Sequence, residues 1–372
     1  MIELDVVARE AASAHARGHT VLLATVVRVA GSSYRRPGAR MLVAEERWLA
    51  GSVSGGCLET DVMRRGPHRV RDGAAVLVRY DSTSDDDIGW GFGASCNGIV
   101  EIMLERLPPD GAHDPLAFAA RCMADEDRGV IVTVFETDNA AIPVGARLFV
   151  RGSAVTMTHP LPPAFLTAAE SADGRARQFS AGGVAALIEV IEPPPRVFVI
   201  GSGHDAVPLV ATTQALGLRV TVADLHASVW LRERFAGADE ILIAPPIEVA
   251  RAIGKRRSAL VVLMTHDYER DRAYLDAVLG TRARYIGVLG PERRTARMLA
   301  ELEQQGSRAS DDALARLHAP AGLDVGAETP REIALAIVAE MQAALTGTPA
   351  GRLRERGGAI HASSRDDGVT AE

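Results

Sequence analysis

The chain has 372 residues, of which 47% are hydrophobic and 24% are charged, an ordinary composition for globular domains with apolar cores. This length suggests two or three domains, and a formal net charge of −7 disfavours a nucleic-acid-binding surface. We find neither an apolar run that would cross a membrane nor a signal peptide, so we expect a cytoplasmic protein. The three cysteines form neither a disulfide framework nor a CxxC zinc pattern.

Arginine supplies almost all of the positive charge, because Lys255 is the only lysine among the 41 basic residues. A P-loop lysine and a Schiff-base lysine are therefore disfavoured, and the GxxxxGK[ST] pattern is absent. We expect any anion that side-chain cations hold to be held by arginine, which binds phosphate and carboxylate groups in a bidentate manner.

The first half of the chain predicts a mixed α/β domain over residues 1–190. Its apolar residues alternate between helical spacing and short β-branched runs, without an internal repeat that we detect. The predicted elements, in chain order, are a helix at 3–17, strands at 20–30 and about 41–54, a helix from 58, strands at 74–80 and 98–107, helices at 114–128 and 162–174, and further strands around the second of these helices.

Three consecutive prolines in IEPPPR predict a linker at residues 191–196, because proline cannot donate in a central strand. Strand and helix patterns alternate strictly after this linker. The alternation indicates a Rossmann-like, doubly wound parallel sheet at residues 197–346. Residues 347–372 are rich in Gly, Arg, Ser and Asp, and we expect a disordered tail there.

The segment VFVIGSGHDAVP contains Gly201, Gly203 and Ala206 in the GxGxxA spacing of dinucleotide-binding folds. Asp224 ends the next strand, about twenty residues later, where an acid that binds ribose belongs. A nucleotide-type ligand is one interpretation, and close packing of helix on sheet at the glycines is the other. Asp205 stands at the start of the helix, where we expect it to cap backbone amides and to repel a diphosphate.

The fourth strand of this sheet ends at Thr265, His266 and Asp267, beside the topological switch point where ligands bind. His266 could bind a ligand or transfer a proton. Alternatively, the three residues form a polar strand end, with Asp267 helping to start the next helix.

A second glycine-bearing loop, GLDVGAETP at 322–330, precedes the last predicted helix. It is either an anion site or only a helix cap. Thr329 is the predicted N-cap, Pro330 takes the first helical position, and Glu332 completes a capping box.

Cys57 lies in GSVSGGCLE, directly after Gly55 and Gly56 and before a predicted helix. A thiol near a helix N-terminus tends to have a lowered pKa, and the two glycines remove side chains that would block a bulky ligand. These features favour a reactive or metal-ligating thiolate over a cysteine that only packs. Cys96 lies in the SCNG turn of an acidic, glycine-rich loop and is also placed for function, whereas Cys122, on an apolar helix, is expected in the core. Two cysteines do not complete a zinc site, so a soft metal or sulfur chemistry is the simpler expectation.

The loop GSSYRRPGAR, residues 31–40, places Arg35 and Arg36 between two strands, with Arg40 at the start of the second. Such a loop could grip a phosphate. Solvated arginines on a surface turn are the alternative.

These motifs together resemble the XdhC/CoxI family. GSVSGGCLE, the upstream GSSYRRPGARM and the CNG before a strand are similar to the N-terminal part of that family. Its C-terminal Rossmann domain is similar to VIGSGHDAVPLV, VTVAD, MTHDYERD, RYIGVLGPERR and GLDVGAETPREIALAI. The resemblance covers most of residues 1–345. Members of the family are accessory proteins of molybdenum hydroxylases such as xanthine dehydrogenase and carbon monoxide dehydrogenase.

The resemblance implies a cytoplasmic chaperone rather than a conventional catalyst. Its cargo would be molybdenum cofactor, a molybdopterin in its mononucleotide or dinucleotide form. The implied partners are a cysteine desulfurase, which makes the terminal sulfido ligand, and the apo-subunit of the hydroxylase; we also expect a homodimer. Cys57 is the candidate contact for molybdenum or its sulfur. The candidate cofactor-binding residues are Arg35, Arg36, Gly55, Gly56, Cys57, Cys96, Gly201, Gly203, Asp205, Asp224 and His266.

The sequence departs from the family pattern at its second cysteine motif, where Asn97 and Gly98 follow Cys96 in place of two glycines. Asparagine tolerates left-handed backbone, so the turn can survive. A close contact between a ligand and the backbone of residue 97 is less assured.

Two other functions remain open from the residues alone. An NAD(P)-dependent oxidoreductase would use the Rossmann motif by itself, with NAD(P) as the less expected cofactor. A redox-sensing regulator would instead form a disulfide between Cys57 and Cys96.

Overall fold

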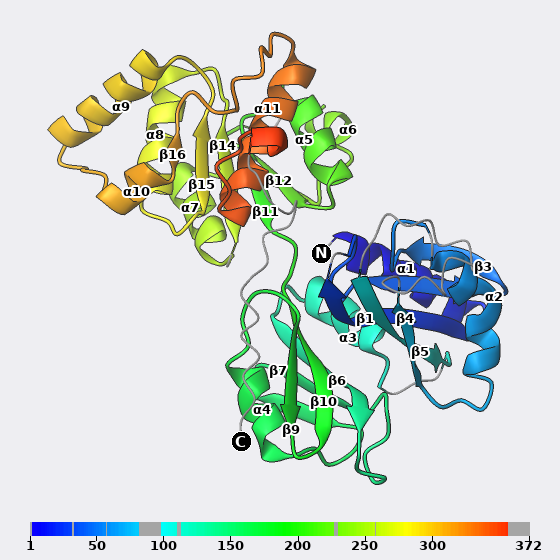
Figure 1. The fold of residues 1–372 in the computed structure, drawn as a ribbon. Coiled ribbons are helices and arrows are strands. Elements are labelled where there is room, and N and C mark those ends of the chain that lie inside the picture. The colour runs from blue at the N-terminus through cyan, green and yellow to red at the C-terminus, as the bar shows by residue number, and fades with distance from the viewer. Residues whose placement is uncertain are drawn as a thin grey trace. The chain divides into compact units, whose positions relative to one another are not determined.

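The computed structural model describes residues 2–31, 33–56, 58–81, 98–109, 113–226, 230–256 and 258–355, and Figure 1 shows the fold. The chain divides into two compact units between Pro193 and Pro194. The division falls within the proline run that separates the last strand of the first unit from the first strand of the second. None of the described helices has the length and apolar character needed to cross a membrane.

The first unit is built on two five-stranded antiparallel sheets, called sheet A and sheet B below. Sheet A has the strand order β3-β2-β1-β5-β4, and sheet B has the order β8-β7-β6-β10-β9. The elements of the first half are α1 (Ile2–Ala16), β1 (Val21–Gly31), β2 (Arg40–Ala44), β3 (Arg47–Gly51), α2 (Glu59–Arg69), β4 (Val76–Asp81) and β5 (Gly98–Leu107). Those of the second half are α3 (Pro115–Ala124), β6 (Gly129–Thr137), β7 (Arg147–Arg151), β8 (Ala154–Met157), α4 (Pro163–Glu170), β9 (Arg177–Ala181) and β10 (Val184–Ile191).

The two halves of this unit repeat one arrangement: a helix, three strands, a helix and two strands, with the same strand order in each sheet. Their registers agree as well, since Thr25 lies opposite Arg40 in sheet A and Thr133 lies opposite Arg147 in sheet B. Both central strand pairs also carry a β-bulge, after Val26 in sheet A and beside Ala186 in sheet B.

The expectation of no internal repeat is therefore wrong. The connections between corresponding elements differ in length, so the two halves do not align along the sequence at one fixed spacing. A trace of the repeat is the Gly-Ala-Arg that opens β2 at residues 38–40 and β7 at 145–147.

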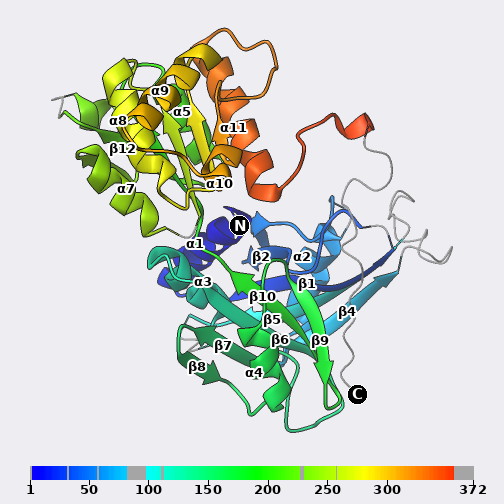
Figure 2. The same ribbon diagram turned by 90° about the vertical axis from the view of Figure 1, so that its left-hand side faces the viewer.

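The helices of the first unit cover the two sheets in a matching way. α1 and α3 share an apolar core with one face of each sheet, where Leu23 of sheet A and Ile131 of sheet B are fully or almost fully buried. The opposite face of sheet A packs against α2, and that of sheet B packs against α4, as Figure 2 shows for α4. Cys122 on α3 is buried in the shared core, which confirms its predicted packing role; burial raises the pKa of its thiol.

Two buried ion pairs join sheet A to sheet B at equivalent positions of the repeat. Arg40 of β2 reaches Glu189 of β10 at 2.7 Å, and Arg147 of β7 reaches Glu105 of β5 at 2.5 Å. All four side chains are buried. Each arginine also donates to the carbonyl of the glycine two residues before it, Gly38 or Gly145. The pairs therefore fix how the two sheets meet.

The second unit is a six-stranded parallel sheet with the order β13-β12-β11-β14-β15-β16. This order and the helices on both faces confirm the predicted doubly wound Rossmann-like fold. Its strands are β11 (Arg196–Ile200), β12 (Arg219–Asp224), β13 (Glu240–Ile243), β14 (Ala259–Leu263), β15 (Tyr285–Val288) and β16 (Leu317–His318). Its helices are α5 (Ala206–Ala215), α6 (Leu231–Arg234), α7 (Pro246–Gly254), α8 (Tyr268–Leu279), α9 (Glu292–Gln304), α10 (Asp311–Ala315) and α11 (Pro330–Thr346), with a short 3-10 turn at Leu353–Glu355.

Alternate residues of the parallel strands face opposite helix layers. Val197 and Val199 pack towards α5, α6 and α11, whereas Phe198 and Ile200 pack towards α7, α8 and α9. The sheet is thus buried on both sides, and its ligand-binding edge is the one at the carboxyl ends of the strands.

Candidate functional site

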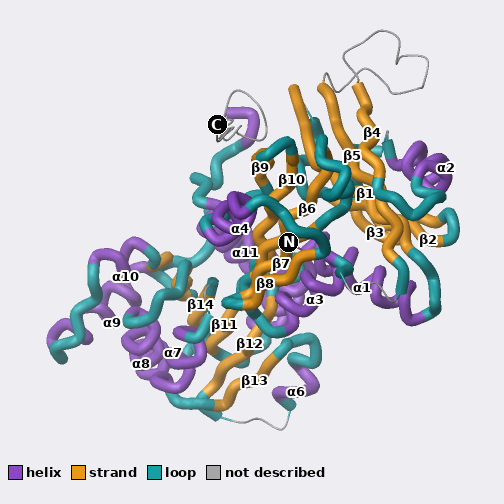
Figure 3. Tube along the Cα trace, turned by 90° about the horizontal axis from the view of Figure 1, so that it is seen from below, coloured by secondary structure: helices purple, strands orange, loops and turns teal. Residues whose placement is uncertain are grey.

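The connections that carry the sequence motifs of the first unit leave sheet A towards one end of its strands. Gly31 at the end of β1 pairs with Gly98 at the start of β5, and Asp81 at the end of β4 pairs with Ile99. The end of β3 and the start of β2 lie further back along the sheet, since Gly51 pairs with Met41 and Met41 pairs with Ala24 of β1 rather than with its end. Figure 3 shows the ends of β1, β4 and β5 together at this edge. The arginine loop begins at this edge and the connection that contains Cys96 ends there, whereas the GSVSGGCLE loop begins further back, level with Ala24 of β1.

At the corresponding edge of sheet B, two of the connections are shorter. There the turn between β9 and β10 consists of Gly182 and Gly183, and only residues 158–162 separate β8 from α4. Residues 82–97 thus join β4 to β5 where only two glycines join β9 to β10, and residues 52–58 precede α2 where 158–162 precede α4. The connection from β1 to β2, residues 32–39, is in contrast no longer than its counterpart at 138–146. Cys57 and Cys96 lie outside the described residues, as does Asn97.

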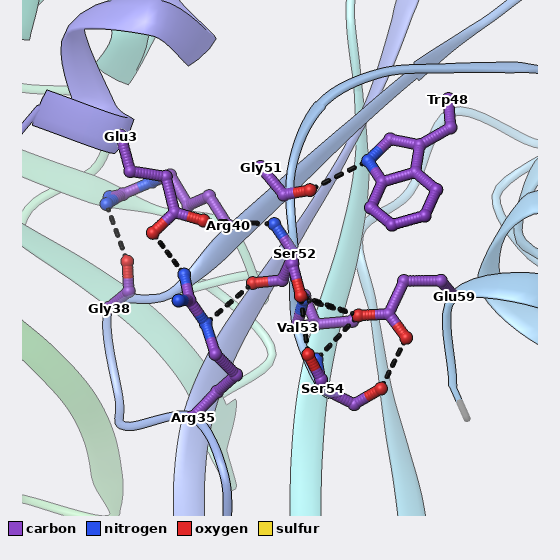
Figure 4. A network of polar contacts seen from close by, with 10 residues as sticks. All are labelled: Glu3, Arg35, Gly38, Arg40, Trp48, Gly51, Ser52, Val53, Ser54 and Glu59. Atoms are coloured by element: carbon purple, nitrogen blue, oxygen red, sulfur yellow. Dashed lines mark hydrogen bonds and ion pairs between the residues drawn. The ribbon is translucent and has the colours of Figure 1, made fainter. Parts of the chain in front are cut away.

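A buried carboxylate organises the GSVSGGCLE loop, as Figure 4 shows. Glu59, the first residue of α2, is only 3% exposed. Its Oε1 accepts hydrogen bonds from Ser52 Oγ at 2.8 Å, Val53 N at 3.1 Å and Ser54 N at 2.7 Å. Its Oε2 accepts from Gly56 N at 3.1 Å and from the Ser54 hydroxyl. The loop from Ser52 to Gly56 thus wraps around one side chain.

Glu59 is held in its charged form. Burial alone would raise the pKa of this carboxyl, but hydrogen bonds from the hydroxyls of Ser54 and Ser52 and from the backbone outweigh it and lower the pKa. Leu58 N also donates to Ser54 Oγ at 3.1 Å, so the backbone is anchored on both sides of residue 57. Sequence reasoning missed Glu59; the available signal was an acid in the first turn of a helix that follows a serine-rich loop.

A second acidic residue fixes the same loop from outside. Glu3, in the first turn of α1, accepts from Ser52 N at 3.1 Å and forms an ion pair with the guanidinium of Arg35. The Nε of Arg35 donates to Ser52 O at 3.0 Å. Arg35, which the sequence suggested for phosphate, thus joins the arginine loop to the GSVSGGCLE loop.

Arg36 faces a different neighbour. Its side chain is half-buried near Arg175 of the turn that precedes β9. Desolvation and the positive charge of Arg175 together lower the pKa of Arg36. The two predicted loop arginines therefore have separate surroundings.

Two exposed aromatic rings lie along the loop, Tyr34 beside Gly55 and Trp48 at its start beside Gly51. The ring of Tyr34, which is 69% exposed, lies 3.6 Å from the position that a Cβ on Gly55 would take. Trp48 is half exposed and donates its indole N–H to Gly51 O at 2.7 Å. Gly56 has open space beside it and a φ angle of 122°, which favours glycine strongly. Flat rings beside a region without side chains suit stacking with a conjugated ring system.

The fingerprint residues of the second unit converge at the carboxyl edge of its sheet. A Cβ on Gly201 would come within 2.5 Å of Met264 O, so β14 can approach β11 closely only because residue 201 is glycine. Asp224, which is largely buried, accepts from Ser202 Oγ at 2.5 Å and from His226 N at 3.3 Å. The predicted ribose-binding acid is thus bonded to the glycine loop of its own fold.

Asp205 does not cap α5, which corrects the expectation from sequence. Its carboxylate makes no capping hydrogen bond, and its Oδ2 lies 2.6 Å from His266 Nε2. His266 lies across the switch point at the end of β14 and takes up the carboxylate instead; its backbone has a φ angle of 60°. Asp267, in contrast, does cap α8 by accepting from Arg270 N at 3.0 Å, as expected.

The loop before α11 behaves as a cap. Thr329 and Glu332 form the predicted capping box, with Pro330 at the first position. The Glu332 carboxylate accepts from the backbone of Thr329 at 2.8 Å and of Glu328 at 2.9 Å, and these bonds lower its pKa. Three loops that could hold an anion therefore bind or face a carboxylate of the chain: Glu59, Asp205 and Glu332.

Among the described residues, no group of three or more His, Cys, Asp or Glu side chains is arranged to hold a metal ion. A site that holds a metal-containing group in this part of the chain would have to bind it through other contacts, such as hydrogen bonds and stacking.

Two family models match the chain. Residues 14–81 match the XdhC and CoxI family, and residues 197–341 match the XdhC Rossmann domain. The chain belongs to the XdhC and CoxI family. The two matches take in the GSVSGGCLE loop and the whole Rossmann fingerprint.

The sequence similarity to relatives extends over most of this chain. A protein of Bacillus subtilis, named as a probable subunit of xanthine dehydrogenase, is 29% identical over 330 residues, which cover 86% of this chain and 92% of the relative. The molybdenum cofactor insertion chaperone PaoD of Escherichia coli is 23% identical over 333 residues, which cover 90% of this chain and 86% of PaoD. A crystal structure described as a xanthine dehydrogenase from Bacillus halodurans is similar with a TM-score of 0.73 and 28% identity, covering 94% of this chain and 98% of that one.

Proposed function

We propose that this protein is an accessory factor of a molybdenum hydroxylase, which binds molybdenum cofactor as cargo and inserts it into the apo-enzyme. Two relatives support the proposal by their names, one as a molybdenum cofactor insertion chaperone and one as part of a probable xanthine dehydrogenase. Both are similar to this chain over more than four fifths of their length.

The observation that carries the proposal is the difference between the two copies of the repeat. Sheet A and sheet B share strand order, registers and bulges, so the fold itself does not demand the long connection at residues 82–97 between β4 and β5. Among the described residues, a loop wrapped around a buried carboxylate is found beside sheet A and not at the equivalent place of sheet B; it adjoins Cys57 in the sequence, and Tyr34 and Trp48 are exposed along it. A scaffold that is decorated in one copy only is typical of a binding site added to a stable fold.

The residues suit the chemistry of this cargo. Molybdopterin offers a flat pterin ring for stacking on Tyr34 or Trp48 and a phosphate for a cation such as Arg36. Thiolate is a soft ligand of the kind that suits a metal already bound by sulfur, and Cys57 supplies it to molybdenum in this proposal. Gly55 and Gly56 leave the clearance that so large a group needs.

The proposal includes three finer steps. The protein works in the cytoplasm, as a homodimer, with a cysteine desulfurase that converts the bound cofactor to its sulfido form. It then delivers the cofactor to the apo-form of a hydroxylase of the xanthine dehydrogenase or carbon monoxide dehydrogenase type. A chaperone that binds the cofactor through a loop, rather than inside a closed core, can release it without unfolding.

The test is a loading and transfer experiment. The purified protein is incubated with released molybdenum cofactor, separated from free cofactor and mixed with an apo-hydroxylase. We expect one cofactor per chain and a rise in hydroxylase activity above the level that free cofactor alone gives. No retention of cofactor, or equal activity with and without the protein, would contradict the proposal.

A further inference from the structure

The Rossmann unit has the architecture of a dinucleotide-binding fold but fills its own phosphate position. In such folds the second glycine of the fingerprint, here Gly203, lacks a side chain so that a diphosphate can approach the backbone. The space over Gly203 is occupied here. A Cβ at this residue would lie 2.5 Å from Asp205 Oδ1 and 3.6 Å from His266 Cδ2.

The occupying group is an acid that a histidine holds in place. Asp205 Oδ2 and His266 Nε2 are 2.6 Å apart, and the pair spans the gap between the ends of β11 and β14. This gap is the switch point of the sheet, where the diphosphate of a dinucleotide lies in other doubly wound folds. The carboxylate is therefore a substitute for the anion that the position otherwise attracts.

The backbone that presents His266 is fixed by both of its neighbours. Thr265 donates from its backbone N–H and its hydroxyl to the buried carboxylate of Asp271, which in turn pairs with Arg294 at 2.6 Å. Asp267 caps α8 on the other side. These contacts keep His266 at a φ angle of 60°, an unfavourable conformation for a residue with a Cβ. The ring is thus directed at Asp205 at a cost that the surrounding structure offsets.

We propose that Asp205, held by His266, stands in the diphosphate position of the Rossmann unit and makes it discriminate against diphosphate dinucleotides such as NAD(P). A diphosphate would have to displace the carboxylate or accept a like charge in contact with it, and either costs binding free energy. Two other polar groups at this edge, Ser202 and Asp224, bind each other. His204, between Gly203 and Asp205, is exposed. Arg234 donates to Ser202 O at 2.8 Å and is engaged on that side.

The test is calorimetric titration of the full chain with NADH and, separately, with inorganic pyrophosphate. Asp205→Ala removes both the charge and the bulk, and we expect it to bind each probe at least about tenfold more tightly than the wild type. Asp205→Asn keeps the size without the charge, so it gains affinity to a smaller extent. His266→Ala keeps the charge of Asp205 but frees its side chain, so its gain does not exceed that of Asp205→Ala.

Asp311→Ala is the matched control, since it removes the same charge from the first turn of α10, away from the fingerprint. It should bind neither probe more tightly than the wild type does. The proposal is overturned if Asp205→Ala and Asp205→Asn bind both probes no more tightly than the wild type. A larger gain in His266→Ala than in Asp205→Ala would also overturn it, because the ring and not the carboxylate would then be the obstacle.

Discussion

The backbone N–H of Ser54 donates a hydrogen bond of 2.7 Å to the carboxylate of Glu59, and so ties the GSVSGGCLE loop to the first turn of α2. Glu59→Gln keeps the size of the side chain but turns an amide nitrogen towards N–H donors. We expect a loss of about 1–3 kcal/mol in the free energy of unfolding at neutral pH and weaker retention of molybdenum cofactor. Urea unfolding and the loading experiment measure the two effects. The exposed Glu10→Gln on α1 is the control and should change neither.

The same residue gives a pH prediction. The pKa of Glu59 is lower in the folded chain than in the unfolded one, so its stabilisation is present above the unfolded value of about 4.3 and is lost as the pH falls through the folded value. The stability gap between wild type and Glu59→Gln should therefore narrow when urea unfolding is repeated at acid pH. A gap that stays constant or widens towards acid would show that the charge of Glu59 is not what stabilises the loop.

The two glycines before Cys57 should respond differently to alanine. Gly56 has a φ angle of 122°, and we expect Gly56→Ala to cost roughly 1–3 kcal/mol of stability. At Gly55 an added Cβ would meet only the Tyr34 ring, at the ordinary contact distance of 3.6 Å, so Gly55→Ala should fold as stably as the wild type. If the missing side chain of Gly55 leaves room for the cofactor, as we expect, Gly55→Ala should retain less cofactor although it is stable. Unchanged retention would assign Gly55 to the turn alone.

The general architecture could be predicted from the sequence because local patterns determine it. Apolar strands that alternate with amphipathic helices predict a doubly wound parallel sheet, and the glycine turn after the first strand places that strand beside the switch point. The observed strand order around β11 agrees with this prediction. The capping box at Thr329 and Glu332 was equally predictable, since both partners lie within one helical turn. The repeat within the first unit was not, because its equivalences depend on strand pairing over long distances.

Polar partners far apart in the sequence were also beyond prediction. Glu3 binds Ser52 and Arg35, and Asp205 turns from its own helix to His266. Each of these contacts replaces the external anion that a local motif suggested. A motif shows which groups are available, whereas only the tertiary structure shows which of them the chain has already paired.

The equivalent ion pairs between sheets A and B should have equal importance. Replacing only Arg147 by Met leaves Glu105 buried without its partner, and we expect a loss of about 3–5 kcal/mol in stability. Arg40→Met should have a similar cost through Glu189. In each case a second change, Glu to Gln, should restore part of the loss in a double-mutant cycle. The exposed Arg9–Asp5 pair of α1 is the control, at less than about 1 kcal/mol. Losses as small as this at the buried pairs would contradict their role.

The backbone strain at His266 can be measured with two substitutions that both remove the ring. Glycine adopts a φ angle of 60° freely, whereas alanine does not. We therefore expect His266→Gly to be more stable than His266→Ala by about 1 kcal/mol in thermal or urea unfolding. Equal stability of the two variants would show that the turn relaxes when the ring is lost, so that the strain belongs to the Asp205 contact.

The binding of molybdenum cofactor through Cys57 is tested most directly by the amount of cofactor that Cys57→Ala retains after loading, relative to the wild type. We predict that the wild type retains one cofactor per chain and that Cys57→Ala loses most of it while unfolding at the same urea concentration. Cys122→Ala is the control: it removes a thiol from the core, so it should lower stability and leave retention unchanged. Equal retention by the wild type and Cys57→Ala would contradict the account.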